Sequence, residues 1–248
     1  MTGPNPFAEL GLGGALAQAG RFAEAEPHLA RAVTLEPLDT GARERWATVL
    51  LELGRADSAR AVLTEGLRRR AWAGGHERLA AIAIATDDLA TAVRAYREAE
   101  RLGARDAAFV AAYAAALRRH ADALDDAGRS GEALAHWREV LRLQPGSQDV
   151  QVRAGWVLAS SPDEALRDGH EALRLARAAI AAAGARPAAV VLALEGAALA
   201  ETGSWEEAVR AARAASDAAV REGSLDEAEL YRAQARLYAA RRAYRWGR

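Results

Sequence analysis

Two His-Glu pairs are the residues whose types and spacing come nearest to catalytic chemistry. His76-Glu77 and His170-Glu171 begin like the His-Glu-x-x-His motif of zinc-binding helices, in which a second His one turn later completes the ligand set. Ala80 and Arg174 stand at that second position. The sequence therefore predicts no zinc hydrolase.

A glycine-rich stretch, Gly11-x-Gly13-Gly14, has part of the spacing of a phosphate-binding turn. No strand precedes it, and Leu16 stands where the last Gly is required, so we interpret it as helix packing. No Gly-x-Ser-x-Gly nucleophile motif is present, and the five His are scattered without acidic or thiol partners. We expect no catalytic residues, no cofactor and no metal site, and predict that the chain is not an enzyme.

Composition narrows the classes of function further. There is no Cys, which removes thiol catalysis, thiolate metal sites and disulfides, and no Lys, which removes Schiff-base chemistry and the Walker-type phosphate loop. A formal net charge of −1 gives no general attraction to nucleic acid. Residues 107–117 are the longest strongly apolar run, well short of the ~20 residues that span a bilayer. We expect no membrane insertion and, since residues 1–20 do not resemble a secretory signal, a cytoplasmic location.

The elements that position these residues follow a repeated pattern, seen best at 128–145. Gly128 and Gly131 allow a turn, apolar residues recur at three- and four-residue steps, and Pro145 ends the helix. The pattern begins also at Gly20, Gly54, Asp87 and Gly203, at steps of roughly 33 to 41 residues with one longer gap before the last. This period predicts an array of helix pairs.

The repeat resembles that of the tetratricopeptide repeat (TPR) proteins, bacterial type, whose helix pair carries Trp-x-x-Leu-Gly-x-x-Tyr, then Ala-x-x-x-Phe, then Pro. The first copy has Leu12-Gly13, Ala25 and Pro37, and the second has Trp46-Ala47 and Ala59. The resemblance implies an all-α fold, a right-handed superhelix of about six helix pairs with a C-terminal capping helix. It divides a single domain, 1–248, into copies at approximately 6–39, 40–72, 73–106, 107–147, 148–187 and 188–222, with the capping helix at 224–245, after an irregular lead over 2–6.

Two copies are expected to be irregular. The fourth should open with a long helix, from about Ala107 to Asp126, because the extra residues favour helix. In the fifth, Ser161 with Glu164 forms a predicted capping box, and Asp168 with Glu171 repeats it. The passage from Gly155-Trp156 resembles a variant repeat of bacterial TPR proteins, which occurs alone or attached to membrane glycosyltransferases.

The terminal helix is expected from Leu225 to about Tyr244, opened by a capping box of Ser224 and Glu227. Its predicted apolar stripe is Leu225, Ala228, Tyr231, Ala235 and Tyr238.

A protein-protein interaction scaffold is the function that this architecture favours, with a peptide segment or partner protein held in the concave groove. The alternative is a targeting or regulatory module of a larger bacterial enzyme, such as a glycosyltransferase system, and a stand-alone enzyme is a third hypothesis. The sequence leaves the partner, the oligomeric state and the possibility of a longer native chain open.

Helix phase locates the groove, because each residue advances ~100° and the positions opposite the packing face can be read off. Acidic residues predominate there, so we expect an Arg- or Lys-bearing peptide, with mutual repulsion of the acids relieved by the ligand. The opposing interpretation is that these charges are only solvated. Trp46, Trp137 and Trp205 are expected in the core. For Trp156 the sequence leaves two alternatives, packing between repeats or contact with a ligand. The predicted partner-binding residues are Glu44, Thr48, Leu51, Glu52, Glu77, Ile84, Arg118, Asp122, Asp125, Asp126 and Trp156.

Overall fold

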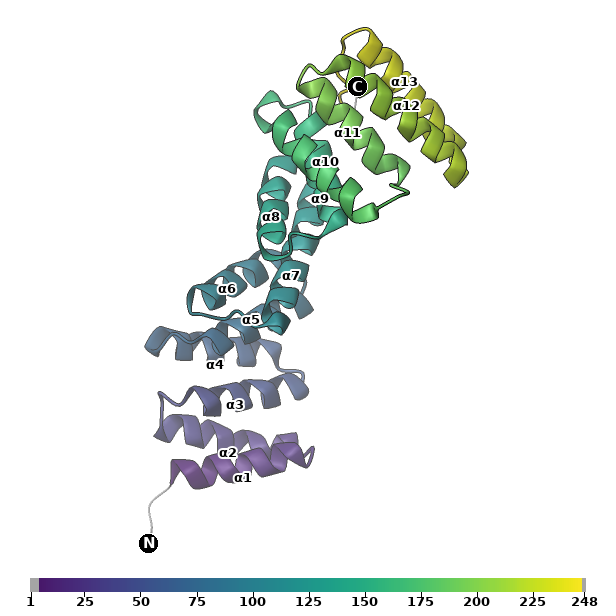
Figure 1. Cartoon of the computed structure of the whole chain (residues 1–248). Helices are drawn as coiled ribbons and strands as arrows, with labels where there is room; N and C mark the ends of the chain where they lie inside the picture. Colours follow the sequence, from purple (N-terminus) through teal and green to yellow (C-terminus); the bar gives the residue numbers. More distant parts are fainter. Residues whose placement is uncertain (1–4, 247–248) are drawn as a thin grey trace. The chain divides into compact units, whose positions relative to one another are not determined.

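The computed structural model describes residues 5–246, in which thirteen α-helices and one 3-10 turn follow one another without a strand (Figure 1). The predicted all-α fold of paired helices with a terminal capping helix is confirmed. Most of the predicted irregular lead, 2–6, lies outside the described residues, and Pro6 already belongs to the first helix. The chain divides into two compact units, 1–116 and 117–248.

Unit 1 holds three helix pairs, stacked so that each helix packs on the next (Figure 1). The turn within each pair contains a residue in the left-handed conformation, which glycine adopts most easily. Gly20 and Gly54 have φ of 73° and 72°, and Asp87 takes φ 57° in the third pair. Asp88 then caps the following helix by accepting from the Thr91 amide at 3.1 Å. The helices are α1 (Pro6–Gln18), α2 (Phe22–Leu35), α3 (Thr40–Glu52), α4 (Ala56–Arg69), α5 (Ala73–Ala85) and α6 (Leu89–Arg101).

Small residues set the helix spacing in the core of unit 1. A Cβ placed on Gly13 of α1 would lie 2.8 Å from Leu29 Cγ, so the absence of a side chain lets α2 approach.

Arg43 of α3 is 5% exposed, and its guanidinium donates to the Pro37 and Val62 carbonyls at 3.0 and 3.3 Å. Burial lowers the Arg43 pKa. These bonds fix the loop between α2 and α3.

α7 (Ala107–Asp126) has the predicted bounds, and the division between the units falls within it, after Ala116. In unit 2 each helix from α8 onward packs on the next, and α9 also packs on α11 (Figure 1). Alanine dominates the contacts among α11, α12 and α13. Trp137 is fully buried, as expected, whereas Trp46 and Trp205 are only partly buried. The helices are α8 (Ser130–Leu143), α9 (Gln148–Ser160), η1 (Glu164–Leu166), α10 (Gly169–Ala183), α11 (Ala189–Glu201), α12 (Trp205–Glu222) and α13 (Leu225–Ala239).

The connection between α9 and α10 contains an added turn, η1, but its predicted cap is wrong. Ser161 follows the end of α9, and its hydroxyl accepts from the Asp163 amide at 3.1 Å. Asp163 is the residue that caps η1, by accepting from the Ala165 amide at 3.0 Å. The second predicted cap is present, because Asp168 accepts from the Glu171 amide at 2.9 Å.

The capping helix is shorter than predicted: α13 ends at Ala239, and the range 224–245 was wrong at its end. Arg241 adopts a left-handed φ of 52°, which reverses the chain. The Ser224 side chain makes no capping hydrogen bond, and Leu225 is 65% exposed, so neither the box nor that end of the stripe forms. Among the described residues, no helix is both long and apolar enough to cross a membrane.

Candidate functional site

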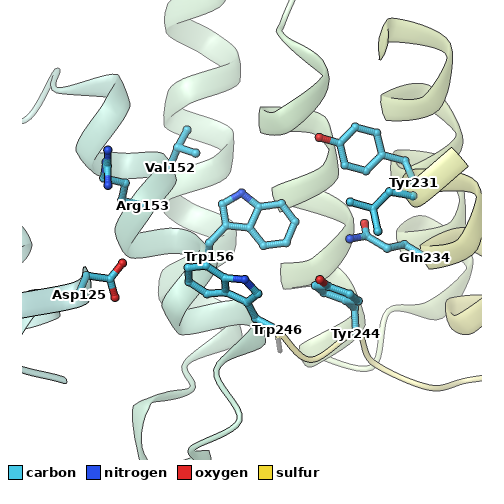
Figure 2. Close-up of a pocket in the computed structure, with 9 residues that line it drawn as sticks. Asp125, Val152, Arg153, Trp156, Tyr231, Gln234, Tyr244 and Trp246 are labelled. Carbon is cyan, nitrogen blue, oxygen red and sulfur yellow. The ribbon is translucent and has the colours of Figure 1, made fainter. Parts of the chain in front are cut away.

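Unit 2 contains a cleft of about 270 Å³ with mainly aromatic walls, called here the aromatic cleft. Trp156 comes from α9, Tyr231 from α13, and Tyr244 and Trp246 from the segment after α13 (Figure 2). Because most of the wall is flat and apolar, the cleft suits a planar or extended group. Its lining is Asp125, Val152, Arg153, Trp156, Leu230, Tyr231, Gln234, Tyr244 and Trp246.

The segment after α13 is held in place by contacts with two other helices. The Trp246 amide donates to the Ser160 carbonyl at the end of α9, at 2.9 Å. The Arg245 guanidinium pairs with Glu201 of α11 at 2.7 Å. The reversal at Arg241 thus returns the chain across the ends of α9 and α11, which places two aromatic side chains at the cleft.

Trp156 is positioned by the close approach of α9 and α11. A Cβ on Gly155 would lie 2.7 Å from Leu194 Cδ2, so the glycine lets the two helices meet. The Trp156 indole is half-buried against an Ala-rich cluster that includes Ala189 and Tyr231. Its remaining surface faces the cleft (Figure 2). Trp156 therefore both packs in the core and lines the cleft.

Three polar side chains face the cleft among the aromatic ones. Gln234 is 1% exposed, and its Oε1 has no hydrogen-bond partner among the described residues. Asp125 Oδ1 accepts from the Ser130 hydroxyl at 2.7 Å. Arg153 lies 3.6 Å from Asp122, measured from Nη1 to Oδ1. The cleft therefore offers an uncommitted amide and a carboxylate, while its cation is paired.

Tyr231 supplies a neutral wall to the cleft. Burial, together with the nearby Glu227 and Glu222 charges, raises its pKa to about 12. The hydroxyl therefore keeps its proton at neutral pH.

Unit 1 has a larger and more polar cleft of about 520 Å³, called here the polar cleft. Glu44 Oε1 accepts from the Trp72 indole at 2.7 Å, and Glu44 Oε2 lies 3.4 Å from Arg78 Nε. Arg78 also donates to the Thr48 hydroxyl at 3.0 Å. These groups hold one another across α3 and α5, so the cleft is already internally paired. Its lining is Gly14, Ala17, Gln18, Phe22, Gly41, Glu44, Arg45, Thr48, Val49, Glu52 and Arg78.

No group of three or more His, Cys, Asp or Glu within the described range 5–246 is placed to hold a metal ion. His76 is half-buried, and burial lowers its pKa. The two clefts present aromatic faces, amides and single charges to a ligand.

The tetratricopeptide repeat family model matches residues 16–71, which run from the end of α1 through α4. The same helix-pair arrangement continues through the rest of unit 1 and through unit 2. The chain is a tetratricopeptide repeat protein. Comparison with curated proteins gives no match.

Solved structures with a similar fold include other TPR proteins at low sequence identity. MamA is 17% identical, over 71% of this chain and 91% of its own, with a TM-score of 0.47. YrrB, described as a TPR protein with an unusual peptide-binding site, is 15% identical over 86% and 96%, with a TM-score of 0.44. The TPR2AB domain of yeast Sti1, solved as a pHSP90 complex, is 16% identical over 95% of this chain and 98% of its own, with a TM-score of 0.42. Since each score is below 0.5, the identification of this TPR protein rests on the family model and the helix pairs.

The residues predicted to bind the partner of this TPR protein fall into three groups. Asp125 and Trp156 line the aromatic cleft, and Glu44, Thr48 and Glu52 line the polar cleft. The third group lines neither of these two clefts: Leu51, Glu77, Ile84, Arg118, Asp122 and Asp126.

Several of the charged residues predicted to bind the partner already form ion pairs within the protein. Mutual repulsion among the acidic residues is therefore smaller than expected. Asp122 pairs with Arg153, and Arg118 pairs with Asp149 at 2.8 Å. Asp126 is exposed. Of the three acids expected to repel one another, Asp122 is therefore offset by a cation, whereas Asp125 and Asp126 form no ion pair with another described residue.

Glu77 is half-buried, and its burial raises the pKa of its carboxyl, with Asp106 and Glu44 raising it further and Arg78 opposing them. Burial of this carboxyl therefore disfavours its ionised form.

Seven of the nine lining residues of the aromatic cleft were absent from the predicted site, and Gln234, Tyr244 and Trp246 are among them. The predicted terminal helix ran to about Tyr244, so no turn was expected before that residue. A turn there brings Tyr244 to Trp156, with ring centroids 6.4 Å apart and planes at 80°. The site depends on that turn.

Proposed function

We propose that this TPR protein is a non-catalytic interaction scaffold that binds a peptide segment of a partner protein in the aromatic cleft. TPR modules in general bind proteins, and the observation that supports this cleft is its wall of four aromatic side chains, Trp156, Tyr231, Tyr244 and Trp246. Trp and Tyr supply large contact areas with few rotatable bonds, so ordering them on binding costs little entropy.

The shape and exposure of the cleft support a peptide rather than a folded surface as the ligand. A cleft of about 270 Å³ admits one or two side chains. The rim contains Leu230 and Trp246, which are 45% and 52% exposed, so apolar surface extends beyond the cleft. A short extended segment covers such a rim while one residue enters the cleft.

The polar cleft is proposed as a second contact surface, through Glu44, Thr48 and Glu52. Glu52 is exposed, whereas Glu44 and Thr48 are held by Trp72 and Arg78. We expect Glu52 to contribute most of the charge that a ligand meets there. That the predicted residues outside both clefts contact a partner remains a prediction.

The proposal is tested by selecting, from a displayed library of random peptides, those that bind the full chain. Selected peptides should lose at least about tenfold in affinity when Trp156→Leu removes the central ring, because aromatic anchors dominate such contacts. Trp46→Leu is the matched control, since Trp46 is also partly buried but lines neither of the two clefts. Absence of any selected peptide, or equal losses in both variants with helical content retained, contradicts the proposal.

A further inference from the structure

The rings of the aromatic cleft are arranged as the walls of a cation-binding cage. Trp156 and Tyr244 meet edge to face, with centroids 6.4 Å apart and planes at 80°, so they form a corner. Trp246 and Tyr231 complete the walls on either side (Figure 2). A cation within ~6 Å of a ring centroid is attracted by the negative face of the ring, and perpendicular rings allow more than one such contact.

The balance of charge at the cleft favours a cation. One carboxylate, that of Asp125, and one guanidinium, that of Arg153, line the cleft, and Asp122 lies beside Arg153 outside the lining. Arg153 lies 3.6 Å from Asp122, so its charge is offset by a neighbour. Asp125 is bonded at Oδ1 by the Ser130 hydroxyl, and no described residue pairs with its Oδ2. The remaining negative charge is therefore that of Asp125.

Gln234 is an independent sign that a ligand belongs in the cleft. A buried amide oxygen without a hydrogen bond is unfavourable and rare, yet this one lies at the wall of the cleft, on a side chain that is 1% exposed. Figure 2 shows the amide directed from α13 toward the cleft. The amide nitrogen is the atom drawn on the side of the cleft, so a flip of the amide is what presents its oxygen to a donor there.

We propose that the aromatic cleft receives the guanidinium of an arginine in the partner peptide, an inference that rests on the proposed function. A guanidinium stacks on aromatic faces and donates several hydrogen bonds in a plane, here to Asp125 and Gln234. A lysine ammonium stacks less well, and a quaternary ammonium has no N–H for either acceptor. Arginine is the side chain that uses all three features.

The test uses blocked pentapeptides, acetyl-Ala-Ala-Arg-Ala-Ala-amide and its citrulline, lysine and trimethyllysine counterparts, titrated into the ¹⁵N-labelled full chain. Citrulline keeps the shape of arginine without its charge. We expect the arginine peptide to shift the indole signals of Trp156 and Trp246, and the citrulline peptide to bind at least about tenfold more weakly. The Trp46 signal serves as an internal control.

Adjacent aspartates supply the matched variants. Asp125→Asn keeps an acceptor for Ser130 but removes the charge, and should weaken the arginine peptide several-fold without changing citrulline binding. Asp126→Asn, the same substitution one residue on and outside the cleft lining, should leave both unchanged.

Three results overturn the arginine assignment: no indole shift at millimolar peptide, equal affinity for arginine and citrulline, or tighter binding of trimethyllysine. Library peptides distinguish this failure from that of the proposed function. If selected peptides depend on Trp156 but carry no arginine, the interaction function stands and the arginine assignment falls. If no peptide binds the full chain, both fall.

Discussion

Replacing Gln234 by methionine should stabilise the protein while weakening its ligand site. Gln234 is 1% exposed and its Oε1 has no partner, so folding buries an amide oxygen that was hydrated in the unfolded chain. An unpaired buried polar group costs about 1–3 kcal/mol. Methionine has a similar length and no such group, and its flexible thioether fills the same space. We expect unfolding of Gln234→Met to require about 1–2 kcal/mol more than the wild type.

Gln151 is the matched control, because it is a second buried glutamine of unit 2 with a different bonding pattern. It is 6% exposed and its Oε1 likewise has no partner, but its Nε2 donates to the Pro145 carbonyl at 2.7 Å. Gln151→Met removes an unpaired oxygen but also leaves the Pro145 carbonyl without its donor, so we expect it to be about 1–2 kcal/mol less stable than Gln234→Met. The same substitution should thus be more favourable at Gln234 than at Gln151.

Urea unfolding followed by far-ultraviolet circular dichroism measures both variants, and the arginine peptide titration measures the site. A change of 1 kcal/mol corresponds to roughly 2–4 °C in Tm for a chain of this size, which provides a second readout. Gln234→Met should lower the affinity for the arginine peptide despite its higher stability. If Gln234→Met is destabilised as much as Gln151→Met, the amide has a partner in the folded protein and the reasoning is wrong.

Three further predictions concern other parts of the chain. Gly13→Ala should destabilise unit 1 by about 1–3 kcal/mol, since its Cβ would lie 2.8 Å from a buried leucine of α2, whereas Gly11→Ala in the same helix meets nothing within 4 Å and should stabilise by about 0.5–1 kcal/mol; equal shifts in their urea midpoints would contradict this. Removing the residues after Ala239 should keep the helical circular dichroism signal but abolish arginine-peptide binding, and retained affinity would mean that the cleft needs no terminal segment. The hydrogen bond from His28 lowers the pKa of Glu9 below 4.5, so its stabilising contribution is present above that value and lost as pH falls through the folded-state pKa; the stability difference between wild type and Glu9→Gln should shrink below about pH 4.5, and a constant difference would refute the assignment.

The helices were predictable because glycine turns and apolar spacing are local signals. α7 was placed at Ala107–Asp126 because the extra residues of the fourth copy favour helix. Local signals also explain the errors. Ser161 and Asp163 both offer a capping oxygen, and only the path of the loop decides that Asp163 caps η1.

Only two of the nine lining residues of the aromatic cleft were predicted from the sequence, for a physical reason. Trp156 and Asp125 followed from helix phase, which is a property of one helix at a time. Tyr244 and Trp246 depend on a left-handed Arg241, and no glycine marks that turn in the sequence. The turn is supported by tertiary contacts, such as that between Arg245 and Glu201, which local propensity does not contain. Whether the Gln234 amide has a hydrogen-bond partner likewise depends on which residues lie beside it in the folded protein.

The hydrogen bond from the Trp246 amide to the Ser160 carbonyl has a consequence for synthesis of the protein on the ribosome. α9 and its indole emerge well before the residues that close the cleft, and helix pairs can fold as they appear. The nascent chain therefore displays Trp156 without Tyr244 and Trp246, in a state that lacks the finished aromatic walls. On the proposed function, a peptide that needs those walls would engage only after residue 246 has left the exit tunnel, once translation has passed the helices of unit 2.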